Sequence, residues 1–156
     1  MAAPLVDPSP ACGREPAMLA DSDIRDLLGQ ARTIAVVGLS DHPYRDSYGI
    51  AGFLQRNGYR VLPVNPNLSG PVLGEQPYAS LRAIEEHVDI VDIFRRPEFV
   101  PEVIEDAIAI GADAVWMQYG AGNPRAALRA EAAGLQVVMN RCIAVEHRRL
   151  RVMRDE

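Results

Sequence analysis

The stretch that decides the fold is residues 33–48, TIAVVGLSDHPYRDSY. It begins with the apolar run 34–37, breaks at Gly38 and continues as a short polar loop. After Ser47 a new apolar pattern with helical spacing opens, at Ile50, Phe53 and Leu54. The stretch therefore predicts a strand, a glycine turn and a helix. In that arrangement backbone N–H groups and the helix dipole converge on one point and favour an anion such as a phosphate.

The same alternation of strand and helix repeats along the chain. Strands are predicted at residues 33–37, 59–64, 89–94, 114–118 and 135–139. Helices are predicted at residues 21–31, 47–57, 97–110, 123–134 and 142–151, with a short one after Ser80. The apolar runs of the strands are continuous, which is typical of a parallel sheet covered on both faces. The prediction is an α/β, doubly wound fold with a five-stranded parallel sheet in the order 3-2-1-4-5.

Length and composition indicate one folded domain. The chain has 156 residues, of which 48% are hydrophobic, enough to bury a core. Residues 1–16 are rich in proline and alanine, and we expect a disordered tail there, followed by the domain at residues 17–156.

Charge and cysteine usage restrict the function. The net charge of −5 argues against a nucleic-acid-binding protein. No apolar run reaches the length of a membrane span, and the N-terminus lacks the pattern of a signal peptide, so we expect a cytoplasmic protein that does not enter membranes. Cys12 and Cys142 match no metal-ligand spacing.

Five motifs together resemble one family. They are VVGLSDHPYRDSY, GYRVLPVNP, VDIVDIFRRPE, AVWMQYG and AGLQVVMNRCIAVEHRRL, which span about residues 34–150. The chain resembles the small stand-alone CoA-binding proteins, whose domain is related to the CoA-binding domain of the succinyl-CoA synthetase α subunit. The resemblance implies a Rossmann-like fold and coenzyme A or an acyl-CoA as ligand. It implies no reaction, because the larger synthetases have a phosphohistidine domain and a nucleotide-grasp subunit for which this chain has no room.

The ligand is expected where the carboxyl ends of the strands meet and the strand order reverses. The N–H groups of Leu39 and Ser40 and the Ser40 hydroxyl are expected to hold a pyrophosphate, and Arg45 would pair with it through two parallel hydrogen bonds. Pro43 would stiffen the loop. The predicted ligand-binding residues are Gly38, Leu39, Ser40, Pro43, Arg45, Ser47, Tyr48, Asn65, Pro66, Phe94, Arg95, Arg96, Gln118 and Gly120.

Each of these motifs also has a plainer interpretation. Asn65-Pro66 is typical of a turn, Arg95-Arg96 of a solvated pair at a helix start, and residues 118–120 of a structural loop. At the level of function, the alternatives are an NAD(P)-binding oxidoreductase or redox sensor, and an assembly module that binds no small molecule. NAD is disfavoured because Gly38 is the only glycine of the turn and Asn65 stands where an acid would bind the ribose. The sequence therefore favours a CoA-binding protein without catalysis of its own, and it leaves the protein partner unknown.

Two further groups of residues are interpreted as structural. Trp116 and Met117 lie inside a predicted buried strand and are expected in the core. Cys142, Glu146 and His147 suggest a catalytic set, but His147 lies off the helix face shared by the other two, which favours a structural role.

Overall fold

A computed structural model describes residues 15–153 of the chain. Its sheet consists of the strands β1 (Thr33–Val37), β2 (Arg60–Val64), β3 (Ile90–Ile93), β4 (Ala114–Met117) and β5 (Gln136–Met139). Its helices are α1 (Asp21–Gln30), α2 (Asp46–Arg56), α3 (Val100–Ala109), α4 (Pro124–Ala132) and α5 (Ile143–Arg149), with short 3₁₀ turns η1 (Leu81–Ala83) and η2 (Pro97–Phe99). Every predicted strand and α-helix is present, with ends that differ from the prediction by at most two residues, except that α3 begins three residues late because residues 97–99 form the 3₁₀ turn η2. The expected tail lies outside the described residues, apart from its last two positions.

All five strands are parallel and form a single sheet, which confirms the predicted α/β class. Their order, however, is β2-β1-β3-β4-β5 and not the predicted 3-2-1-4-5. After β2 the chain bonds along its outer edge, where the Tyr78 N–H donates to Pro63 and the Tyr78 carbonyl accepts from Asn65. It then crosses the sheet and pairs β3 with the free edge of β1. Right-handed crossovers allow both orders, so the hydrophobic pattern alone does not choose between them.

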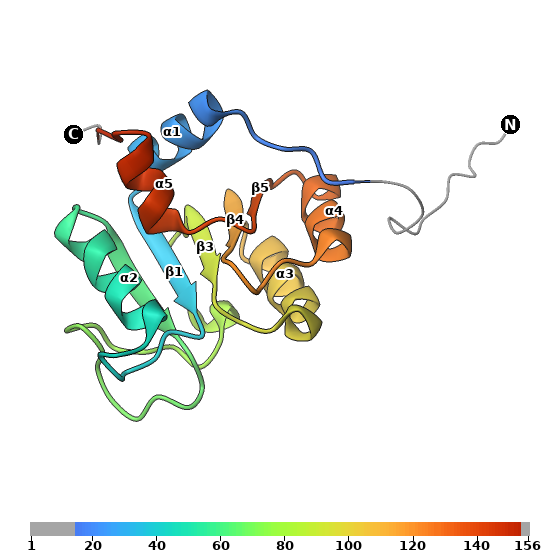
Figure 1. Cartoon of the computed structure of the whole chain (residues 1–156). Coiled ribbons are helices and arrows are strands. Elements are labelled where there is room, and N and C mark those ends of the chain that lie inside the picture. Colours follow the sequence, from blue (N-terminus) through green and yellow to red (C-terminus); the bar gives the residue numbers. More distant parts are fainter. Residues whose placement is uncertain (1–14, 154–156) are drawn as a thin grey trace, which may run out of the picture.

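The sheet has an apolar cluster on each face, which explains why its strands read as continuous hydrophobic runs. On one face Val91, Val115 and Val137 pack against η1, α3 and α4. On the other face Val36, Trp116 and Val138 pack against α1, α2 and α5. Trp116 and Met117 are fully buried, as expected. Figure 1 shows the strands running side by side between the two groups of helices.

Helices α4 and α2 begin in different ways. Asn123 caps α4 as its sequence predicts, since its Oδ1 accepts a hydrogen bond from the Ala126 N–H at 3.1 Å. Helix α2 begins at Asp46 without a capping side chain, with Arg45 at the N-cap position.

No helix among the described residues has both the length and the apolar character that crossing a membrane requires.

Candidate functional site

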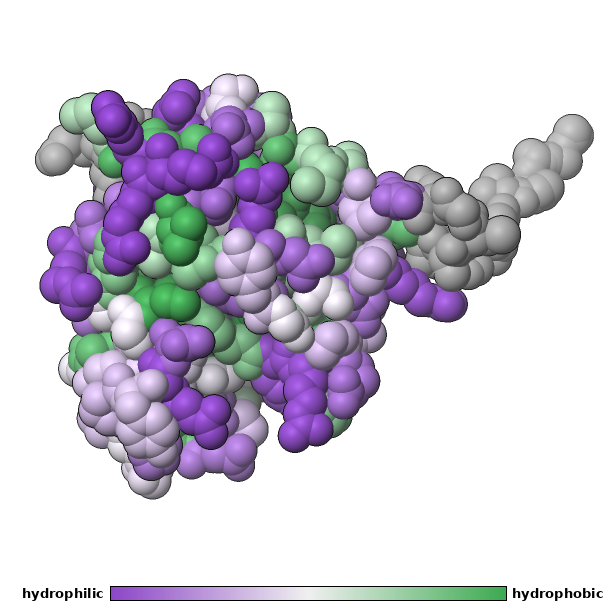
Figure 2. All heavy atoms as spheres, in the orientation of Figure 1, coloured by the Kyte–Doolittle hydropathy of each residue, from purple (hydrophilic) through white to green (hydrophobic). Residues whose placement is uncertain are grey.

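The carboxyl ends of β1, β2 and β3 meet at one edge of the sheet, and the loops that follow them enclose two adjoining hollows of about 660 and 760 Å³. Both hollows are lined by Gly38, Arg45, Asn65, Asn67 and Phe94, so they form one continuous depression, which we call the carboxyl-edge hollow. In the view of Figure 1 these strands end toward the bottom, and Figure 2 shows a notch between hydrophilic residues in that region. A separate hollow of about 570 Å³ lies between α3 and α4 and contains none of the predicted ligand-binding residues.

Gly38 allows β1 and β3 to end close together. Its φ is +87°, in the left-handed region that a side chain disfavours. A Cβ at this position would overlap the carbonyl oxygen of Phe94 and would lie 3.3 Å from Cδ of Arg95. The glycine therefore allows both the turn after β1 and the close approach of the loop after β3. The two loops lie together because β3 pairs directly with β1 in the sheet.

Asn65 fixes the end of β2 to the loop after β1. Its Nδ2 donates to the carbonyl of Leu39 at 3.1 Å, and its Oδ1 accepts from the Asn67 N–H at 2.9 Å. The Leu39 side chain is fully buried in the core cluster that covers one face of the sheet. Asn65 thus forms a turn and also determines the shape of the hollow.

The serines of the β1–α2 loop bond to each other. The Ser40 N–H donates to Oγ of Ser47 at 3.0 Å, and Oγ of Ser40 accepts from the His42 N–H at 3.0 Å. The Ser40 N–H, which is expected to help hold a pyrophosphate, therefore already donates a hydrogen bond to Ser47 in this structure. Ser47 is buried, and its bond closes the loop against the start of α2.

Three guanidinium groups lie at the hollow, those of Arg45, Arg95 and Arg96. Within residues 15–153 none of them forms an ion pair. Arg95 lies over the ring of Phe99, with 4.9 Å from its Cζ to the ring centroid. Three cations without a carboxylate partner favour an anionic ligand.

Carboxylates also line the hollow and limit its positive character. They are Asp41, Asp46, Glu102 and Asp106. Asp106 is paired with Arg82 at 2.6 Å, which leaves it little influence on a ligand. The site is therefore not a general basic patch, and its attraction for an anion depends on where the three arginines lie.

An aromatic pair on the rim of the hollow was missed from the sequence. The rings of His42 and Tyr44 stack with 5.2 Å between centroids and 25° between planes. Tyr44 is 78% exposed although it is large and apolar in part. The two rings flank Pro43 in the sequence, and this alternation of aromatic residues around a proline is the signal that could have indicated the pair.

Several predicted residues lie outside the lining of the hollow. Pro43 is exposed at the tip of its loop, and Tyr48 is half-buried against the core cluster on the α2 face. Gln118 is buried, and its Oε1 accepts from the Ile143 N–H at 3.0 Å, so it anchors the start of α5. Gly120 is exposed with a φ of +86°. Gln118 thus contributes to holding the loop after β4 against α5.

The residues around α5 join helices to one another. Glu146 is buried and accepts hydrogen bonds from Arg141 and Arg149, and Arg149 also bonds Asp21 of α1. The ring of His147 packs edge-on against that of Phe53. These contacts agree with the structural role expected for Glu146 and His147.

Comparisons with known proteins match this arrangement to a family. The CoA binding domain family matches residues 32–148 of the chain. The uncharacterised protein YneT of Bacillus subtilis is 38% identical over 126 residues, which are 81% of this chain and 93% of that protein. The structure of a hypothetical protein from Pyrococcus horikoshii has a TM-score of 0.82 and 42% identity, and the match covers 85% of this chain and 92% of that one. An acetyl-coenzyme A synthetase of Ca. Korarchaeum cryptofilum gives a TM-score of 0.62 and 26% identity over 72% of this chain, but over only 26% of the synthetase. The chain belongs to the family of CoA-binding domains.

Proposed function

We propose that the protein binds coenzyme A or an acyl-CoA in the carboxyl-edge hollow and has no catalysis of its own. The observation that carries this proposal is the meeting of the Gly38 turn, the start of α2 and three guanidiniums, which form no ion pair within residues 15–153, at the point where the strand order reverses. Family membership supports the chemical identity of the ligand. We further propose that residues 17–156 form one ligand-binding unit and that it acts in the cytoplasm.

The phosphates of CoA would be held at the start of α2. The first N–H groups of a helix have no partner within the helix, and its dipole favours negative charge there. Arg45 precedes this helix directly, and its guanidinium would add two parallel hydrogen bonds to a phosphate. Arg95 and Arg96 follow β3 on the other side of Gly38 and would bind the second phosphate group of the ligand.

The remaining predicted residues would shape the site or complete it. Asn65, Pro66 and Phe94 line the hollow, and the stacked rings of His42 and Tyr44 offer a flat surface to a base. The ligand-binding residues proposed from the sequence remain Gly38, Leu39, Ser40, Pro43, Arg45, Ser47, Tyr48, Asn65, Pro66, Phe94, Arg95, Arg96, Gln118 and Gly120. Those that line the hollow are expected to contact CoA, and the others are expected to act through the loops that they hold.

Two observations favour binding without catalysis and disfavour NAD(P). Asn65 stands at the end of β2, where an acid would bind the ribose diol of NAD(P). Both polar atoms of its side chain are already bonded within the protein. Among the described residues that line the hollow, no serine or cysteine side chain is hydrogen-bonded to a histidine ring. In addition, the matching synthetase is far longer than the part that resembles this chain.

We expect CoA to raise the melting temperature of the protein, and NAD, NADP and ATP to leave it nearly unchanged. A ligand that binds only the folded state at about a hundred times its Kd adds about 2.7 kcal/mol, which corresponds to roughly 5 °C or more for a domain of this size. A thermal-shift series with CoA, acetyl-CoA and the three other nucleotides measures this. Equal or larger stabilisation by NAD would refute the assignment of the ligand, and no shift with any of them would favour an assembly module.

Arg45→Ala is expected to weaken CoA binding about ten- to a hundredfold, because a charge-assisted contact to phosphate is lost. Arg56→Ala is the matched control. Arg56 lies exposed at the far end of the same helix, and its substitution removes the same charge. It should change the affinity by less than about twofold, because exposed charges more than about 10 Å apart are largely screened at moderate salt. Calorimetric titrations of the three proteins with CoA provide the comparison. If both variants bind alike, Arg45 makes no local contact and the proposed phosphate site is wrong.

A further inference from the structure

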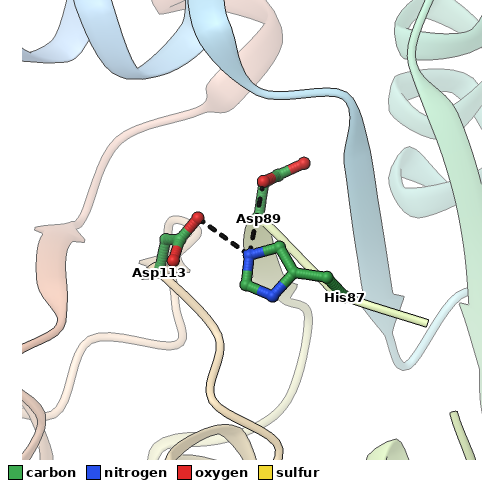
Figure 3. Close-up of side chains that lie close together, drawn as sticks. All are labelled: His87, Asp89 and Asp113. Atoms are coloured by element: carbon green, nitrogen blue, oxygen red, sulfur yellow. Dashed lines mark hydrogen bonds and ion pairs between the residues drawn. The ribbon is translucent and has the colours of Figure 1, made fainter. Parts of the chain in front are cut away.

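We propose a binding site for a divalent transition metal ion, of the Zn²⁺ class, at the edge of the sheet opposite the carboxyl-edge hollow. Its ligands are His87, Asp89 and Asp113, which lie just before strands β3 and β4. Figure 3 shows the two carboxylates directed at the same ring nitrogen of His87. One imidazole and two carboxylates from different parts of the chain are a mixed ligand set that suits zinc and similar ions.

The separations of the ligand atoms fit one bound ion. Nε2 of His87 lies 3.0 Å from Oδ2 of Asp113 and 3.5 Å from Oδ1 of Asp89. The three ligand atoms all lie within 4.8 Å of one another. For metal–ligand distances of about 2.1 Å, two ligand atoms at roughly 90–110° from the metal are about 3.0–3.4 Å apart. The two separations from the ring nitrogen therefore suit a metal ion placed between the ring and the carboxylates.

Asp89 is already oriented for this role. Its Oδ2 accepts hydrogen bonds from the N–H groups of Arg32 and Thr33, both at 2.9 Å. These bonds fix the carboxylate against the start of β1 and leave Oδ1 directed toward the histidine. A ligand held by such outer contacts loses little freedom when a metal binds. The side chains of His87 and Asp113 are each 55% exposed, so water has access to the remaining coordination positions.

The electrostatic surroundings also favour a cation. A hollow of about 560 Å³ adjoins the cluster and is lined by Asp89 and Asp113 together with Asp23 and Asp26 of α1. Among the described residues that line it there is no arginine. A hollow with four carboxylates and no basic side chain concentrates cations near the proposed ligands.

The test is a titration of the metal-free protein with Zn²⁺ at about pH 7.5, followed by calorimetry and by NMR of the histidine rings. We expect one equivalent of Zn²⁺ to bind and the signals of His87 to shift. His87→Gln and Asp113→Asn should each weaken binding at least about tenfold. Both side chains are exposed, so the variants should fold, and circular dichroism checks this.

His42→Gln serves as the matched control. His42 is also an exposed histidine near an aspartate, with 3.7 Å between its Nε2 and Oδ1 of Asp41, but it lies at the other edge of the sheet. Its loss should leave Zn²⁺ affinity within about twofold. Absence of saturable binding below about 1 mM Zn²⁺, or a His87→Gln variant that binds within about tenfold of the unaltered chain, would overturn the proposal.

Discussion

Replacing Gly38 by alanine is expected to lower the free energy of unfolding by about 2–4 kcal/mol and to disrupt the proposed CoA site. The new Cβ would overlap the Phe94 carbonyl, which is backbone and cannot rotate away as a flexible side chain would. The residue would also keep a φ of +87°, which alanine disfavours. The ends of β1 and β3 must then separate, and the loops that carry Arg45 and Arg95 move with them. Urea unfolding measures the first effect, and a CoA titration of the folded variant measures the second.

Gly134→Ala separates the two causes of this loss. Gly134 has a φ of +93°, but a Cβ there would meet no atom within 4 Å. Gly134→Ala therefore costs only the strain of the backbone conformation, about 1 kcal/mol of stability. Gly134 also lies outside the carboxyl-edge hollow, so the substitution leaves the proposed CoA site unchanged. If the two variants lose the same stability to within about 0.5 kcal/mol, the approach of β3 to Gly38 is not tight and the argument for the turn fails.

The sequence predicted the elements of the fold because hydrophobic periods and turn residues are local signals. Asn123-Pro124 marks the start of α4, and the apolar run 34–37 marks β1, without reference to the rest of the chain. The position of β3 beside β1 is different in kind. It depends on how residues 65–89 cross the sheet, and those residues have almost no periodic pattern, so both orders were compatible with the sequence.

The candidate site was predicted to a similar extent. Gly38, Arg45, Asn65 and the Arg95-Arg96 pair follow strands, and the carboxyl ends of parallel strands must share an edge. Whether a side chain at that edge faces the hollow or the protein depends on side-chain bonding. Gln118 bonds the Ile143 N–H of α5, a contact between two segments that the sequence does not place together, and the Ser47 side chain bonds the Ser40 N–H within one loop.

Asp92 is a buried side chain that no sequence pattern explains, and it leads to the second large prediction. It lies in β3 between Val36 of β1 and Trp116 of β4, and it is fully buried. Neither of its carboxyl oxygens has a hydrogen-bond partner among the described residues. Burial without a partner raises the pKa of Asp92 well above 3.8, because a charged carboxylate is poorly solvated in an apolar core.

The contribution of Asp92 to the stability of the protein is therefore expected to fall as the pH rises above about 4. Between the ordinary pKa near 3.8 and the raised folded-state value, the folded chain retains a proton that the unfolded chain releases. Unfolding is then favoured by about 1.4 kcal/mol for each pH unit until the folded-state pKa is reached. Asp92→Asn keeps the shape of the side chain and removes the titration. It should match the unaltered chain near pH 4 and become progressively more stable than it at higher pH.

Urea unfolding of both proteins from about pH 4 to pH 9 gives the comparison, and the difference between them isolates Asp92. His87 also has a raised pKa, so its stabilising contribution is complete below its unfolded value of 6.5 and is lost as the pH passes its folded value. That contribution is the same in both proteins and cancels in the difference. The carboxyl groups of Asp21, Glu86 and Glu105 have lowered pKa values, so they add stability with rising pH in both proteins, mainly below about 4.5, and also cancel. A difference that stays constant over the whole range would mean that Asp92 is ionised in the folded protein and stabilised by a cation or by water.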